Sequence, residues 1–521
     1  MALRRATRIV LWSLLGVLVA LVIAVIVVLT VPAPAERWMQ GRIVLALRQH
    51  YGADVQLQNL HVTLIPVFRA SADNFVLPNR GNPDLPPLIT VKHFTMEAAP
   101  FQLLRQPVHI SNLELDGLEI KVGPKGQNSN STSSHKGPVT PETRTRLSNF
   151  VIDRVQANGT KLYVLRKDPS REPMLFDLRQ LRLRSAGAGR PMTFIAQLTN
   201  PTPPGLIDTT GHFGPWNFDD PSGTKVDGHY NFQHADLSVF NGISGILSSV
   251  GDYSGVLHNI VVDGSTDVPN FQLDSGGQEV HLTTQFHAIV DGTNGNTYLQ
   301  PVKAHFLDSD IVTNGEIAGK PGQKGKTISL DVDIQQAHLQ DVLALATKSA
   351  TPALTGGLVM QAKLDLPPGD MPVLQKMLLN GNFHVSDAHF NDAKVKQAIA
   401  ELSRRGQGKP DDQSITDVAA QFAGDFRLAK STLTFNSLHF QVPGAAAQMK
   451  GTYGLSASSI NFVGDVELQA TVSQTMSGAK RVLVAPLDPL FKKHGAGTYL
   501  PVSITGTTDH PQLHLDWKKL F

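Results

Sequence analysis

From about residue 55 onwards, hydrophobic and polar residues alternate along the chain in short stretches. The pattern is clear in VHLTTQFHAIV at 280–290, in TISLDVDI at 327–334 and in INFVGDVELQATV at 460–472. Successive side chains of a β-strand point to opposite faces, so each stretch predicts a strand with one apolar and one polar face. Turn signals such as DGTNGN at 291–296 separate these stretches. The sequence therefore predicts a mostly β protein.

Few segments carry the spacing of a helix. NDAKVKQAIAELSRR at 391–405 places Val395, Ile399 and Leu402 on one helical face, and shorter helices are expected at 338–349 and 35–50. GPKGQNSNSTSSHKGP at 123–138 is a low-complexity segment and predicts a loop. These few helices provide little cover for an extended apolar sheet face.

The chain also contains an internal repetition with a constant offset of 136 positions. The residues that recur in kind are Phe286, Val302, Gly315, Leu330, Val332 and Ile334, which correspond to Phe422, Leu438, Gly451, Val466, Leu468 and Ala470. A constant offset through two strand-rich stretches suggests that one β module is used twice.

The N-terminus predicts a membrane anchor. Residues 9–31 form an uncharged run of 23 residues, which as a helix would extend roughly 34 Å and cross a hydrocarbon core of about 30 Å. Arg4, Arg5 and Arg8 precede it, so the N-terminus is expected in the cytoplasm and the bulk of the chain on the other side. VPAPAE at 31–36 offers small residues for signal cleavage, but the long apolar run favours an uncleaved anchor.

Charge and cysteine content exclude several classes of function. The 521 residues include 46 basic and 44 acidic side chains, and this near balance argues against a nucleic-acid partner, which requires a basic face. The chain has no cysteine, so it has neither disulfides nor a thiolate metal site.

The stretch GKPGQKGKT at 319–327 is similar to a phosphate-binding loop. Its Gly325, Lys326 and Thr327 fit the end of the Walker pattern, but Lys320 occupies the position of the first required glycine. The residues that follow alternate as a strand, whereas a phosphate loop needs a helix whose amides face the anion. We therefore expect a polar hairpin turn and no nucleotide.

No catalytic or metal-binding set can be assembled from the sequence. Ser477 and Lys480 match the S-x-x-K of serine–lysine acyl enzymes, but the companion motifs are missing, so a helix cap with a solvated lysine is the preferred interpretation. His510 and His514 are four apart on expected strands, which separates them by roughly 13 Å. We therefore predict no enzyme activity, no cofactor and no metal site.

The alternating strands instead predict an apolar face that requires cover. A sheet can curl and leave a trough lined by apolar side chains, which would suit acyl chains, or it can close into a β-sandwich core, and the pattern alone leaves both open. The residues expected to line the trough are Val280, Leu282, Phe286, Leu330, Val332, Phe422, Phe426, Leu438, Phe440, Val466, Leu468, Val502 and Ile504.

Both ends of the chain resemble AsmA-like proteins. The C-terminal run 451–516 has the features G-x-Y-x-L at 451–455, F-x-G at 462–464, D-P-L-F at 488–491, G-A-G-T-x-x-P-x-x-I-x-G-T at 495–507 and a terminal H-P-Q-L-H-L-D. The N-terminal stretches that are similar to the family are 50–66 and 86–122, the latter with PFQLLRQ before I-x-x-L-x-L-D-G-x-x-I. Between about 140 and 370 the resemblance is limited to β-rich character.

This resemblance implies an inner-membrane anchor and an elongated, curled antiparallel β-groove in the periplasm, related to TamB-like and bridge-like lipid transfer proteins. It implies no catalytic residues. The expected regions are a cytoplasmic tip and anchor at 1–35, an N-terminal β region at 36–122, a loop at 123–146, a central groove at 147–370 and a C-terminal region at 371–521.

The expected function is that of an inner-membrane, single-pass protein that binds or conducts phospholipids and supports outer-membrane biogenesis. The alternative is a structural or assembly factor that contacts other envelope proteins and carries no lipid. About 25 strands at about 4.8 Å each would give a groove of roughly 120 Å, which favours a partner or a shuttle mode for crossing between two membranes.

Overall fold

The structure is a computed structural model of the 521-residue chain. It describes residues 56–63, 67–78, 86–102, 107–122, 150–164, 173–187, 189–217, 220–274, 276–320, 325–347, 349, 351–369, 371–492, 495–508 and 510–516. The predicted anchor at 9–31, the predicted helix at 35–50 and the predicted loop at 123–138 lie outside these ranges. Among the helices that are described, none has the length and hydrophobicity needed to cross a bilayer.

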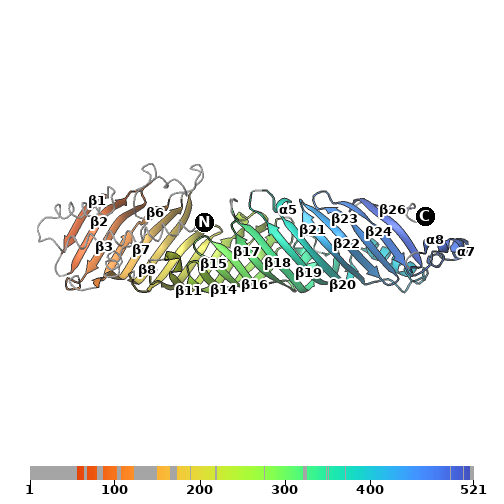
Figure 1. Cartoon of the computed structure of the whole chain (residues 1–521), viewed down its shortest axis with the longest axis horizontal. Helices are drawn as coiled ribbons and strands as arrows, with labels where there is room; N and C mark the ends of the chain where they lie inside the picture. Colours follow the sequence, from red (N-terminus) through yellow and green to blue (C-terminus); the bar gives the residue numbers. More distant parts are fainter. Residues whose placement is uncertain are drawn as a thin grey trace. The chain divides into compact units, whose positions relative to one another are not determined.

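The chain is mostly β, as predicted, and its strands form a long, curled antiparallel sheet with few helices (Figure 1). Two units can be distinguished. Unit 1 contains the described residues up to Val239 together with Leu247–Thr266 and His287–Thr297, and unit 2 contains Phe240–Ile246, Asp267–Phe286 and Tyr298–Phe521.

The first eleven strands belong to unit 1. Their bounds are β1 Gln56–Thr63, β2 Phe68–Leu77, β3 Ile89–Ala98, β4 Val108–Ile110, β5 Asn112–Asp116, β6 Glu119–Val122, β7 Phe150–Val164, β8 Met174–Ala186, β9 Met192–Pro201, β10 Pro204–Phe213 and β11 Lys225–Asp236. They pair antiparallel, except that β7 runs parallel to the three short strands β4, β5 and β6. A 3-10 turn, η1, spans Pro221–Gly223.

One face of the strands β1–β7 carries a buried apolar core. Ile89 and Ile152 are 0% exposed, and Phe68, Ile110 and Leu113 are 1% exposed. Each belongs to a strand whose apolar residues alternate with polar ones, so burial follows the period of two that the sequence predicts.

Five further strands follow β11 in the sequence. Their bounds are β12 Ile243–Ser244, β13 Ile246–Val256, β14 Asn259–Leu273, β15 Val280–Asp291 and β16 Asn296–Phe306, with the 3-10 turn η2 at Leu237–Val239 before them. β12 pairs antiparallel with β14.

Unit 2 ends in ten strands, each hydrogen-bonded antiparallel to the next. These are β17 Ser309–Ala318, β18 Thr327–His338, β19 Leu354–Leu366, β20 Leu378–Phe390, β21 Ala420–Ala429, β22 Thr432–Val442, β23 Ala445–Gly454, β24 Ser459–Leu468, β25 Thr498–Thr507 and β26 Pro511–Leu515. The segment after the 319–327 loop is thus the strand β18, which removes the helix that a phosphate loop needs.

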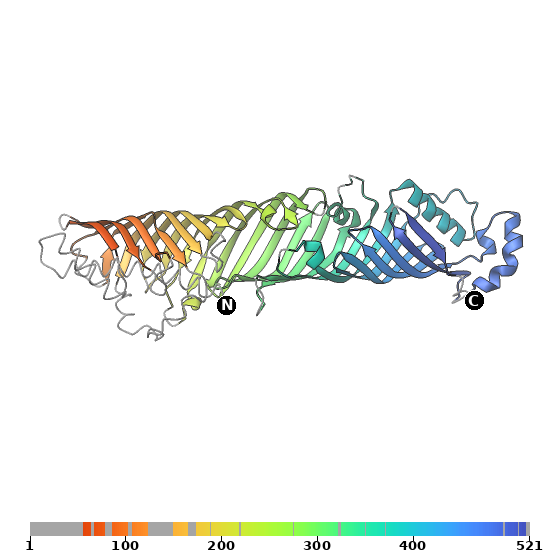
Figure 2. The ribbon, with the colours of Figure 1, turned by 90° about the horizontal axis from the view of Figure 1, so that it is seen from above.

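The described helices are short and lie in unit 2 (Figure 2). They are α4 Leu339–Ala344, α5 Val373–Lys376, α6 Ala393–Gly406, α7 Ala479–Val484 and α8 Asp488–Phe491, with 3-10 turns η3 Ser473–Thr475 and η4 Ala485–Leu487. The longest, α6, begins where Asp392 accepts hydrogen bonds from the backbone amides of Lys394 and Val395, and ends with Arg404 and Arg405 in its last turn, two arrangements that stabilise helix ends.

The repetition with an offset of 136 positions coincides with strand boundaries. Strands β16 and β22 begin at 296 and 432 and end at 306 and 442. Strands β17 and β23 begin at 309 and 445 and end at 318 and 454. All four differences are 136. The repeated unit therefore includes two consecutive strands, each as long as its counterpart.

Candidate functional site

The ten strands β17–β26 present one continuous apolar face. The register shows this directly, because Phe422 lies opposite Phe440, which lies opposite Ala447, which lies opposite Val466, which lies opposite Leu500. We call this surface the apolar face. Its large side chains include Ile328, Leu330, Val332, Ile334, Leu358, Met360, Leu364, Leu379, Phe383, Val385, Phe422, Phe426, Leu428, Leu433, Phe435, Leu438, Phe440, Met449, Ile460, Phe462, Val466, Leu468, Leu500, Val502 and Ile504.

One margin of the apolar face is covered. Val385, Val442 and Leu468 are fully buried there in a cluster that also includes Ala400 of α6. Ile399 of α6 packs against the same cluster from the helix side. This margin behaves as a small closed core.

Away from that margin many side chains of the apolar face are only half-buried, although Phe426, Leu428 and Val502 are buried. Leu330, Leu438, Phe462 and Ile504 all keep part of their surface in contact with solvent. A closed core would bury such large side chains completely, as unit 1 does with those of β2, β3 and β5. The centre of the face is therefore accessible to a ligand, and its lining is hydrocarbon.

Phenylalanine rings line the centre of the apolar face. Ring centroids of Phe422 and Phe440 are 5.1 Å apart, and those of Phe435 and Phe462 are 5.9 Å apart. Phe383 on β20 and Phe435 on β22 have a third strand between them, yet their ring centroids are 6.2 Å apart. Two strand spacings amount to about 9.6 Å, so these two rings lean toward each other across β21.

Glycines lie beside these rings. Gly424 is opposite Phe383 on one side and Leu438 on the other, and Gly451 is opposite Phe435 and Phe462. A Cβ on Gly424 would lie 2.5 Å from the backbone oxygen of Ser437 and 3.3 Å from the Phe383 ring. The absence of a side chain allows the neighbouring rings to lean over the strand, and Gly424 is buried.

The structure places the thirteen residues predicted to line a trough on strands of unit 2. Ten of them belong to the apolar face, namely Leu330, Val332, Phe422, Phe426, Leu438, Phe440, Val466, Leu468, Val502 and Ile504. The remaining three, Val280, Leu282 and Phe286, lie on β15, on the side opposite the exposed His281.

Exposure differs among these thirteen. Val280, Phe426, Leu468 and Val502 are buried, at 3%, 9%, 7% and 7% exposed, and are therefore largely covered by neighbouring side chains. The other nine are half-buried. Sequence reasoning did not include Phe383, Phe435, Phe462 or Met449, although the alternation in NGNFHVSD at 380–387 and its equivalents carries the same signal.

The opposite face of the sheet is polar and carries a recurring histidine–aspartate contact. Eight such pairs are present in the described residues, with N···O distances from 2.5 to 3.1 Å. The pairs are His93–Asp73, His109–Asp153, His212–Asp227, His229–Asp252, His281–Asp267, His287–Asp263, His305–Asp310 and His389–Asp417. Most of them join neighbouring strands, and they account for many of the 19 histidines.

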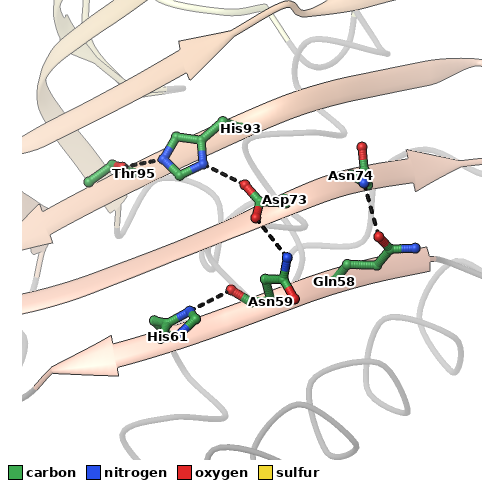
Figure 3. Close-up of polar contacts among 7 residues, drawn as sticks. All are labelled: Gln58, Asn59, His61, Asp73, Asn74, His93 and Thr95. Carbon is green, nitrogen blue, oxygen red and sulfur yellow. Dashed lines mark hydrogen bonds and ion pairs between the residues drawn. The ribbon is translucent and has the colours of Figure 1, made fainter.

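One of these contacts belongs to a larger network in unit 1 (Figure 3). His93 Nδ1 donates to Asp73 at 2.7 Å, and the amide of Asn59 donates to the other carboxylate oxygen at 3.0 Å. His93 Nε2 also lies 3.1 Å from the hydroxyl of Thr95. The hydrogen bond from His93, followed by that from Asn59, holds the pKa of Asp73 below its usual value, because both stabilise the carboxylate.

Strands β10, β11 and β13 carry two pairs of hydroxyl groups in unit 1. Thr209 Oγ1 lies 2.8 Å from the hydroxyl of Tyr253, and Ser249 Oγ lies 3.1 Å from that of Tyr230. Burial raises the pKa of both tyrosines, so both hydroxyls stay protonated at neutral pH. The four hydroxyls form two neutral hydrogen-bonded pairs, and none is a charged group suited to acid–base chemistry.

The motifs considered for catalysis are not assembled into a site. Ser477 and Lys480 are exposed, and Gly478, with φ of 59°, takes the N-cap position of α7 that Ser477 was expected to hold. His510 and His514 are exposed, and the described residues contain no group of three potential metal ligands.

The sequence profile of the AsmA family matches residues 3–136 of this chain. This match covers about a quarter of the chain and includes the N-terminal stretches at 50–66 and 86–122, which resemble AsmA-like proteins. Comparisons with curated proteins and with solved structures give no match.

Proposed function

We propose that this AsmA-like protein binds phospholipids through the apolar face of unit 2 and moves or holds them in the cell envelope. The observation that carries the proposal is that many large apolar side chains of that face, among them Leu330, Leu438 and Phe462, are only half-buried. Leaving a hydrocarbon surface in water costs about 25 cal/mol for each Å², and acyl chains would remove that cost while the lipid head groups stay in water.

The dimensions of the apolar face suit acyl chains. Ten adjacent strands have nine intervals of about 4.8 Å, which gives roughly 43 Å across the strands. One leaflet of a bilayer core is about 15 Å deep. The face is therefore long enough to accommodate more than one acyl chain along its length. Its lining has no charged side chain, so selection by head group is not expected there.

The family assignment supports a place in the envelope. The run at 9–31 would anchor the chain in the inner membrane, with the N-terminus in the cytoplasm and the strands in the periplasm. Since the chain has no cysteine, a single introduced cysteine at the exposed Ser254 gives one reactive position for a membrane-impermeant maleimide. Labelling in cells with a permeabilised outer membrane is expected, and labelling only after lysis would contradict this orientation.

Photo-crosslinking within cells tests lipid binding directly. A benzoylphenylalanine at Leu438, at the centre of the apolar face, is expected to yield phospholipid adducts that mass spectrometry identifies. The matched control is His439, the next residue on β22, which is exposed on the polar face. Lipid adducts from 438 and none from 439 are the expected result.

The crosslinking experiment also distinguishes lipid binding from the alternative function, that of a structural or assembly factor. An assembly factor without lipid would yield protein adducts from the polar face and no lipid adducts from Leu438. That result would reject lipid binding by the apolar face. The proposed role involves binding alone, with no catalytic step and no cofactor.

A further inference from the structure

The most exposed large apolar side chains of the described residues lie on a short helical excursion. Between β24 and β25 the chain forms α7, η4 and α8, residues 479–491. Val482 and Leu483 are each 76% exposed, and Leu487 and Leu490 are 45% and 46% exposed. We call residues 479–492 the helical tip. Isolated exposed apolar residues are common on protein surfaces, but four within nine positions form a patch.

The helical tip has a defined position in unit 2. Its α8 contacts β25, and both ribbon views place α7 and α8 beyond the last strands (Figures 1 and 2). Leu483 belongs to α7, Leu487 to η4 and Leu490 to α8. Three successive short helical segments therefore each present an exposed leucine.

The exposed charges of the helical tip are all positive. Lys480, Arg481 and Lys492 are exposed. The only acidic residue of the tip, Asp488, is turned toward the body of the unit, where it accepts hydrogen bonds from the backbone amide and the hydroxyl of Ser473 at 2.8 and 2.7 Å. The surface that remains combines leucine and valine with cations.

We propose that the helical tip docks on the surface of an anionic phospholipid bilayer. An exposed apolar stripe flanked by lysine and arginine is the pattern of segments that lie in the membrane interface, where the cations are attracted by anionic head groups. A bilayer surface adapts to the tip and needs no pocket of matching shape. Docking covers the four apolar side chains and neutralises the three cations together.

This position also identifies where lipid would enter or leave, an extension that rests on the proposed function. The last strand, β26, pairs with β25 and has Leu513 and Leu515 66% and 39% exposed. Their partners across the ladder, Ile504 and Val502, belong to the apolar face. A bilayer bound by the helical tip would therefore lie close to the exposed end of that face.

Docking can be measured with the full chain, its N-terminal segment held in a nanodisc so that it cannot insert into the test vesicles. Vesicles of phosphatidylethanolamine and phosphatidylglycerol are added and floated. The nanodisc-held chain is expected to float with them. The double variant Val482→Asp with Leu483→Asp is expected to reduce this binding by about tenfold or more, since each side chain contributes apolar area. Both positions are exposed, so folding is not affected.

Two controls separate this effect from general changes in the surface. Val359→Asp replaces another exposed valine, 41% exposed, on the polar face of β19, and is expected to leave flotation unchanged. Lys480→Glu with Arg481→Glu is expected to weaken binding and to remove most of its salt dependence, because salt of about 1 M shortens the Debye length to about 3 Å.

The results also distinguish this inference from the proposed function. Flotation of the Val482/Leu483 double variant at the wild-type level would overturn the inference, as would flotation that requires added envelope proteins. If Leu438 gives no lipid adducts while the helical tip still docks, lipid binding by the apolar face fails and docking stands. If adducts form at Leu438 and the tip does not dock, docking by the helical tip fails and lipid binding by the apolar face stands.

Discussion

A charge introduced into the apolar face is expected to destabilise the fold slightly at one position and severely at another. Leu438 lies at the centre of the face and is half-buried, whereas Leu468 lies under the covered margin and is 7% exposed. Both are leucines on neighbouring parts of the same sheet, so Leu438→Asp and Leu468→Asp differ mainly in whether the new carboxylate can reach water.

The magnitudes follow from burial. Full burial of a leucine stabilises a fold by about 1.5–3 kcal/mol, and a half-buried leucine contributes about half of that. Leu438→Asp is therefore expected to lower the free energy of unfolding by about 1–2 kcal/mol. At Leu468 the whole apolar contribution is lost and a charge is buried among Val442, Ala445 and Ala400, so a loss of about 4 kcal/mol or more is expected.

Urea unfolding followed by circular dichroism, with hydrogen exchange of peptides from β21–β25, provides the assay. Leu438→Asp should keep a cooperative transition and lose phospholipid from the purified protein. Leu468→Asp should remove protection throughout this part of unit 2, because total stabilities are about 5–15 kcal/mol. The control, His439→Asp on the polar face, should change neither property. If Leu438→Asp removed protection as completely as Leu468→Asp, the apolar face would be a closed core and the reasoning would be wrong.

Two further predictions concern the glycines of the apolar face and the polar network of unit 1. Gly424→Ala is expected to destabilise the fold by about 1–3 kcal/mol, because the added Cβ meets the backbone of Ser437. The control is Gly357→Ala, whose Cβ would approach only the Ser386 hydroxyl at 3.0 Å, and its stability should stay within about 0.5 kcal/mol of the wild type. Equal urea midpoints for the two variants would contradict this prediction. The pKa of Asp73 is lowered in the folded state, so its stabilisation is present above the unfolded pKa of about 3.9 and is lost as pH falls through the lowered value. Asp73→Asn should therefore lose less stability than the wild type between pH 5 and pH 2 in urea titrations, and equal losses would show that the network does not act through this carboxylate.

The alternation of apolar and polar residues was sufficient to predict the strands and the orientation of their side chains. In β18, Leu330 and Val332 lie on the apolar face and Asp331 on the polar face, as period two requires. The helix expected at 391–405 is α6, since its apolar spacing and the Asp392 cap act locally. The helix expected at 338–349 is shorter, because it ends at Ala344 and a turn follows.

Burial could not be predicted in the same way. Leu468 and Leu438 both occupy apolar positions of alternating strands, yet one is covered by the margin that includes α6 and the other is not. That difference depends on a helix about 60 residues from Leu468 in sequence and on the curl of the strands. The histidine–aspartate contacts likewise join residues from 5 to 44 positions apart. The sequence therefore did not identify which aspartate each histidine contacts.

The glycines offer a sequence signal that distinguishes the two apolar surfaces of this chain. Strands β2, β3 and β5, whose apolar sides are fully buried, contain no glycine. The half-buried apolar face of unit 2 includes Gly381, Gly424, Gly451 and Gly464, set among phenylalanines. A glycine facing a closed core leaves a cavity, and cavities destabilise cores in proportion to their volume. A glycine facing an accessible surface leaves only additional room, which a flexible hydrocarbon chain can fill. The pairing of Gly381, Gly424 and Gly451 with phenylalanines on neighbouring strands therefore supports the proposal that the apolar face of unit 2 binds a hydrocarbon ligand.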